Sequence, residues 1–301
     1  MPTPQKPSGS PVALVERCGR AARSLCVLFI FLCGSLATAV GNAQSGLGDL
    51  LITPTRIVFE GRQRTAEITL VNTGHSTATY RIAFVNLRMN EKGGTVEIGA
   101  TEAGPDERFA EDLIRYSPRQ VILEPQVGQT VRMQLRLPAD LAPGEYRSHL
   151  LFRAVPTPEA TAKDADPAAD FRVQLTAIYG ISIPIIVRHG ETSATTTLSE
   201  LALVPPTGSE TTPSLRFGIH RAGNRSVYGN LTATFVPAVG KPSVVGIVNG
   251  VAVYTPNVLR LAGIALRAPP GVTFTKGRLH LAYTRQEKGN ETIAEADLLV
   301  P

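Results

Sequence analysis

The chain has 301 residues, of which 43% are hydrophobic and 18% are charged, and its formal net charge is +5. No cluster of lysine and arginine interleaved with aromatic residues occurs, so the charge does not indicate a nucleic-acid-binding protein. The length is sufficient for a leader and two domains of ordinary size.

The first 43 residues predict a secretory signal peptide. Four basic residues precede an apolar run, Ser24–Val40, that ends in small residues. We expect cleavage after Ala39 or Ala43. The alternative is an uncleaved membrane anchor, but a spanning helix needs roughly 18–20 apolar residues and Gly34 weakens the run. We therefore expect an exported protein, with no segment after the leader that could span a membrane.

Removal of the leader changes both the charge and the cysteine content. The leader holds four of the 30 basic residues and one of the 25 acidic residues, so the rest carries 26 basic and 24 acidic groups, a net charge of +2. All three cysteines, Cys18, Cys26 and Cys33, lie in the leader. The exported chain should contain no disulfide, and burial of apolar side chains must stabilise it.

Short alternating segments with Gly, Pro and Asn at the breaks fill residues 44–189. In Val131–Leu137, apolar and polar residues alternate with the period of two that is typical of a half-buried strand. After Pro143-Gly144 a second strand is predicted. About seven such strands indicate an immunoglobulin-like sandwich. Residues 157–170, rich in Ala, Pro and Asp, predict a surface loop. In the strand that follows Pro143-Gly144, one face has Tyr146, Leu150 and Phe152. The other face, which we expect to be solvated, has Arg147, His149 and Arg153.

Residues 190–301 predict a second, smaller β-sandwich. Seven alternating segments follow one another, from TTTLSELALV to AEADLLV, and the pairs Pro205-Pro206 and Gly223-Asn224 are among the breaks. The predicted fold class is therefore all-β, with two immunoglobulin-like sandwiches after the signal peptide and a boundary near residue 189.

Sequence patterns of catalysis and metal binding are missing. No HExxH, GxSxG or glycine-rich phosphate loop occurs, and no cysteine follows the leader. We therefore expect a protein that is not an enzyme and that has no catalytic residues, no metal site and no cofactor. The five histidines are scattered along the chain: His75, His149, His189, His220 and His280.

Five phrases follow one another in the first predicted domain: TPTRIVFEG (Thr53–Gly61), VNTG (Val71–Gly74), YSPRQVILEP (Tyr116–Pro125), GQTVRMQLR (Gly128–Arg136) and PGEYRSHLLF (Pro143–Phe152). Together, in this order, they resemble the N-terminal domain of periplasmic pilus-assembly chaperones, the PapD-like superfamily. The resemblance covers most of this domain, whereas the second domain is similar only in length, strand pattern and position.

The resemblance implies a chaperone that lends a β-strand to pilus or related fibre subunits whose own sandwich is incomplete, and that delivers them to an outer-membrane usher. The lent strand would be Phe171–Val187, and Pro184 suits a sheet edge. The alternative is that the same side chains face the domain's own core, because alternation cannot say which face is inward. The client-binding residues would be Phe171, Val173, Leu175, Ala177, Ile181, Ile183 and Ile185.

The resemblance also implies an anchor for the carboxylate at the end of the client chain. The first basic residue of the anchor corresponds to Arg56, whose planar guanidinium suits a carboxylate. The second, usually a lysine, corresponds to Ser182 or Pro184, neither of which is basic. Arg188 lies beyond that point and is a possible substitute.

A function of a different class stays open. A secreted two-sandwich module that binds or supports another structure, without chaperone activity, would have the same strand pattern, because a fold does not determine a function.

Overall fold

The computed structural model describes residues 49–156, 178–208, 211–285 and 291–301. These residues form strands and two short 3-10 helices, η1 (Ala100–Glu102) and η2 (Glu111–Leu113), and no α-helix occurs among them. The all-β fold with two sandwiches, predicted from the sequence, is confirmed. The predicted leader, the loop 157–170 and four predicted client-binding residues, Phe171, Val173, Leu175 and Ala177, lie outside the described residues.

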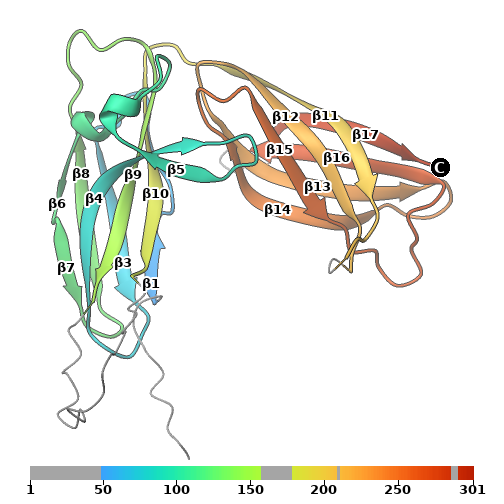
Figure 1. Cartoon of the computed structure of the whole chain (residues 1–301), viewed down its shortest axis with the longest axis horizontal. Helices are drawn as coiled ribbons and strands as arrows, with labels where there is room; N and C mark the ends of the chain where they lie inside the picture. The colour runs from blue at the N-terminus through green and yellow to red at the C-terminus, as the bar shows by residue number, and fades with distance from the viewer. Residues whose placement is uncertain (1–48, 157–177, 209–210, 286–290) are drawn as a thin grey trace, which may run out of the picture. The chain divides into compact units, whose positions relative to one another are not determined.

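Two sheets form the first sandwich, which runs from blue to yellow in Figure 1. One sheet has the strand order β1-β3-β8-β6, and the other has the order β2-β10-β9-β4-β5, with β7 also paired to β4. The strands are β1 (Leu50–Thr53), β2 (Ile57–Phe59), β3 (Thr65–Asn72), β4 (Ala78–Met89), β5 (Thr95–Ile98), β6 (Ile114–Ser117), β7 (Gln120–Leu123), β8 (Gly128–Leu135), β9 (Gly144–Val155) and β10 (Gly180–His189).

The alternation of apolar residues places the core of this sandwich between its two sheets. Val131 and Met133 of β8 face Leu150 and Phe152 of β9 within one buried cluster, and none of the four is more than 2% exposed. Burial of each such side chain contributes about 1.5–3 kcal/mol. The two clearest strand predictions are therefore confirmed, together with the faces that they bury.

The second sandwich follows directly, since β10 ends at His189 and β11 begins at Ala194. Its sheets have the strand orders β11-β12-β15 and β14-β13-β16-β17, and its core includes Phe217, Leu231 and Tyr283. The domain boundary near residue 189 stays a prediction. The strands are β11 (Ala194–Val204), β12 (Ser214–Gly223), β13 (Val227–Pro237), β14 (Ser243–Val253), β15 (Leu259–Ala265), β16 (Gly277–Arg285) and β17 (Glu291–Val300).

A break in the first strand positions the candidate site. β1 pairs with β3 in one sheet, whereas β2 pairs with β10 in the other, so the chain crosses between the sheets over residues 54–56. Pro54 has no N–H and cannot continue the pairing of β1. Arg56 is the last residue of this crossing and directly precedes β2.

Candidate functional site

One edge of β10 is unpaired over half of its length. β9 pairs with β10 along one side, from Gly180 to His189, whereas β2 covers the other side only from Ile185 to Val187. Among the described residues, the backbone from Gly180 to Pro184 therefore has no neighbour on that side. Ile178 and Tyr179, just before this edge, are each 56% exposed, and Ile181 is 39% exposed. Unpaired edges with exposed apolar side chains are sites where another strand can add.

Arg56 lies where this free edge ends. β2 is parallel to β10, with Ile57 opposite Ile185, so extending the register by one residue places Arg56 opposite Pro184. Of the two positions that the sequence left open for a second basic residue, Pro184 is thus the one opposite Arg56 in the sheet. Neither residue can provide a positive charge there.

Aromatic side chains of the second sandwich hold the guanidinium of Arg56. Its Cζ lies 4.4 Å from the ring centroid of Tyr228, and its Nη1 lies 3.5 Å from the hydroxyl oxygen of Tyr254, to which it donates. The Nε of Arg56 is buried and has no hydrogen-bond partner among the described residues. Cation–π contacts of this kind contribute about 0.5–2 kcal/mol and leave the N–H groups at the edge of the guanidinium available for an anion.

Arg188, the substitute suggested by the sequence, is already paired on both sides. In the sheet register Glu145 of β9 lies opposite Arg188, and Glu60, which follows β2, lies on its other side. Arg188 donates from Nε to Glu145 at 3.0 Å and from Nη1 to Glu60 at 2.9 Å, and its side chain is 5% exposed. Its charge is therefore neutralised, which argues against a second role as the anchor.

Glu145 also connects the two sandwiches. Its carboxylate accepts hydrogen bonds from the backbone N–H and the hydroxyl of Ser226, and its side chain is 0% exposed. The hydroxyl oxygen of Ser226 in turn accepts a bond of 2.9 Å from the N–H of Thr255. A buried charge needs such a complete set of partners. The network therefore holds Arg188 and Ser226 in fixed positions beside the site.

A cationic pocket of about 220 Å³ adjoins Arg56. Four arginines line it, two from the first sandwich and two from the second, together with Tyr228. Glu60 neutralises part of this charge, because it accepts from Arg225 at 3.1 Å as well as from Arg188. Burial, followed by the charge of Arg188, lowers the pKa of Arg225, and Arg285 lowers it further against the pull of Glu60. The four arginines are Arg56, Arg188, Arg225 and Arg285.

Arg147 and His149 do not face solvent, and the prediction that they are solvated was wrong. They lie on the outer face of β9, as alternation predicted, but they are only 8% and 5% exposed. The guanidinium of Arg147 lies 4.2 Å from the ring centroid of Tyr254, and the ring of His149 packs edge-on against the same tyrosine. The second sandwich thus covers this part of the sheet. Arg153, further along β9, is exposed as predicted.

The environment keeps His149 neutral. Burial, and then the charges of Arg147 and Arg56, lower the pKa of His149 to about 3. Burial also lowers the pKa of Arg147. The aromatic residues that contact these side chains come from the second sandwich, 198 residues away in the case of Arg56 and Tyr254, and no signal in the sequence pointed to them.

Two of the predicted client-binding residues face the core of their own sandwich. Ile183 and Ile185 are 2% and 0% exposed and belong to the main cluster of the first sandwich. In the free chain these two side chains therefore face the core of their own domain, which is the alternative that the sequence left open. Of the three predicted residues that the structure describes, only Ile181 is exposed.

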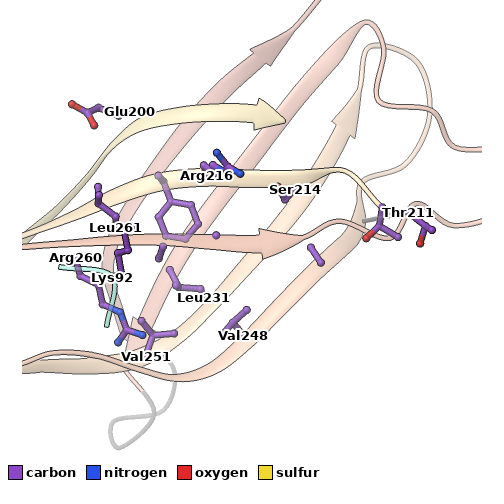
Figure 2. A pocket seen from close by; sticks show the side chains of 15 residues that line it. Lys92, Glu200, Thr211, Ser214, Arg216, Leu231, Val248, Val251, Arg260 and Leu261 are labelled. Carbon is purple, nitrogen blue, oxygen red and sulfur yellow. The ribbon is translucent and has the colours of Figure 1, made fainter. Parts of the chain in front are cut away.

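A larger cavity, of about 1060 Å³, lies in the second sandwich (Figure 2). Apolar residues of β13 and β14, among them Leu231, Val248 and Val251, line it, with Thr211 and Glu200 also at its boundary. Lys92, Arg216, Arg260 and Glu200 also line it, but none of its lining residues belongs to β10. We therefore place the candidate site at the smaller pocket, which adjoins the free strand edge.

Comparisons with known proteins show similarity to fimbrial chaperones. No family model and no curated protein matches the chain. The CupB2 chaperone of Pseudomonas aeruginosa is 11% identical, with a TM-score of 0.40 over 83% of this chain and 100% of that chain. The Escherichia coli chaperone DraB is 12% identical, with a TM-score of 0.39 over 84% and 96%.

A third match is a complex. The Acinetobacter baumannii CsuC–CsuE pre-assembly complex of a chaperone and a tip adhesion subunit is 12% identical, with a TM-score of 0.40 over 83% of this chain and 97% of that chain. In the part of the chain that the structure describes, no helix has the length and apolar character needed to cross a membrane.

Proposed function

We propose that this protein is a periplasmic chaperone that lends the free edge of β10 to subunits of a pilus or related surface fibre and delivers them to an outer-membrane usher. The observation that carries the proposal is the geometry of that edge. It is open from Gly180 to Pro184, β2 covers it from Ile185 to Val187, and Arg56 directly precedes β2. A strand added to β10 must therefore end beside Arg56.

The charge of Arg56 selects the direction of the added strand. A strand that runs parallel to β10 would end there with its terminal carboxylate, whereas an antiparallel strand would begin there with its positive amino terminus. Because a cation attracts the first and repels the second, the site favours a parallel client strand with a free carboxylate. β2 already pairs with β10 in the parallel sense.

Backbone hydrogen bonds and apolar side chains would supply the affinity. Ile181 is exposed, and in the sequence the same alternation continues back to Phe171, through residues outside those described. Each large apolar side chain that enters a groove of the client would contribute about 1.5–3 kcal/mol. Ile183 and Ile185 would contribute indirectly, since they fix β10 to its own core.

The alternative function is that of a secreted binding or structural module without a client. Such a module needs no open strand edge and no unpaired cation at its end. A neighbouring gene for an incomplete subunit or for an usher would favour the chaperone, and identification of the chain that co-purifies from the periplasm would decide between the two.

Replacing Arg56 with alanine tests the proposal. We expect the variant to fold but to recover much less of the co-purifying client, because a hydrogen bond to a charged group contributes about 1.5–3 kcal/mol, or roughly a 10- to 100-fold change in affinity. Quantitative mass spectrometry of the co-purified client measures the effect. Arg132→Ala is the matched control, since the side chain of Arg132 on β8 is 80% exposed and pairs with Glu67, away from the free edge of β10. Equal recovery by the Arg56→Ala and Arg132→Ala variants would rule out the anchor.

A further inference from the structure

Among the described residues, one arginine of the pocket beside Arg56 has no carboxylate partner, and another has only a distant one. Arg188 and Arg225 share Glu60, and Arg188 also binds Glu145. Among the described residues, Arg56 donates a hydrogen bond to Tyr254 and stacks on the rings of Tyr228 and Tyr254, and it forms no ion pair. The fourth arginine, Arg285 of β16, pairs with the exposed Glu291 at 4.0 Å, which is longer than the ion pairs of Arg188 and Arg225.

These two arginines approach the pocket from different sandwiches. Arg56 comes from the crossing before β2, and Arg285 comes from the end of β16. Collecting like charges around one cavity costs free energy, and an anion bound between them would remove that cost. The buried Nε of Arg56, which has no partner among the described residues, indicates the same kind of ligand.

The size of the pocket limits what can bind. A volume of about 220 Å³ is many times the roughly 10–15 Å³ that one water needs, and it suits a carboxylate with a few further atoms but not a folded segment. Planar guanidinium groups bind carboxylates through paired N–H groups, which makes an arginine from each side a suitable clamp.

We infer that Arg285 supplies the second cation of the carboxylate site, so that the client's chain end is held between the two sandwiches by Arg56 and Arg285. The basic residue that β10 lacks at Pro184 is thus replaced from the second sandwich. This inference rests on the proposed function for the identity of the carboxylate, but the clamp itself can be tested without a client.

A titration of the purified protein with N-acetyl-L-alanine, a small carboxylate, tests the clamp. The Nε–H signals of Arg56 and Arg285 in nuclear magnetic resonance spectra are expected to shift together and to saturate. The uncharged analogue, N-acetyl-L-alanine amide, should leave both signals unchanged. Arg285→Gln is expected to weaken binding of the acid about tenfold or more, and Arg285→Lys should retain most of it because the charge remains.

Arg278→Gln is the matched control. Arg278 lies on the same strand as Arg285, outside the pocket, and pairs with Asp297 at 2.7 Å, so its loss should leave the affinity unchanged. Thermal melts show whether each variant is folded. An Arg56 signal that shifts while that of Arg285 does not, or equal affinity in the Arg285→Gln and Arg278→Gln variants, would overturn the inference. Binding of the acid by both arginines, combined with unchanged client recovery in Arg56→Ala, would instead support the clamp as a carboxylate site and contradict its role in holding the client.

Discussion

Replacing Glu145 with alanine is expected to lower the free energy of unfolding by about 3–5 kcal/mol, because the change leaves a buried arginine without one of its two carboxylates. The side chains of Glu145 and Arg188 are 0% and 5% exposed, so water cannot take the place of the lost partner. The variant also removes the acceptor of two hydrogen bonds from Ser226 and so weakens the connection between the sandwiches. Urea denaturation followed by fluorescence or circular dichroism measures the loss.

The matched control is Glu60→Ala. Glu60 binds the same arginine, but its side chain is 48% exposed, and exposed ion pairs contribute about 0–1 kcal/mol. We therefore expect a small loss in this variant and a large one in Glu145→Ala. Equal losses in the two variants would show that burial of the Glu145–Arg188 pair does not determine its contribution.

Lowering the pH is expected to destabilise the wild type more than a His149→Phe variant. The folded-state pKa of His149 is about 3, below the value of 6.5 for a free imidazole. Below pH 6.5 the unfolded chain therefore binds a proton that the folded chain does not bind, and stability falls by about 1.4 kcal/mol for each pH unit down to the folded pKa. Between pH 6.5 and about pH 4.5 this amounts to roughly 2–3 kcal/mol.

Denaturation curves at several pH values provide the measurement. Phenylalanine keeps a ring against Tyr254, whose centroid lies 6.2 Å from that of His149, but it cannot bind a proton. Protonation of carboxylates in acid destabilises both proteins equally, so the difference between the two curves isolates the contribution of His149. His220→Gln, at an exposed histidine on β12, serves as the control and should follow the wild type. Parallel curves for wild type and His149→Phe would contradict the buried, neutral state.

Local alternation was sufficient to predict the strands, because every second side chain of a half-buried strand faces the core and is apolar. Val131, Met133, Leu150 and Phe152 were assigned to a buried face and lie in the core. The same alternation could not say what covers the outer face. Arg147 therefore had the pattern of a solvated residue, although Tyr254 of the second sandwich packs on it.

The position of the candidate site depends on the register between β2 and β10, which could not be predicted from the sequence. The family phrase identified Arg56, but only the parallel pairing of β2 with β10 places it opposite Pro184 and at the end of the free edge. Arg188 had a suitable charge and sequence position, and only its contacts with Glu60 and Glu145 show that it is already occupied. Arg285 lies 229 residues after Arg56 in the sequence, and no local pattern connects the two.

Photocrosslinking from the free edge of β10 tests the central claim most directly. A photoreactive amino acid at position 181 would lie on that edge, and one at Val244, an exposed residue of β14, would serve as the control. After irradiation of living cells, mass spectrometry identifies the peptide linked to each site. The proposed function predicts that position 181 links to the last strand of a client chain, that Arg56→Ala greatly reduces this product, and that position 244 gives no such product. A link from position 181 to an internal segment of its partner, or a yield unaffected by Arg56→Ala, would contradict it.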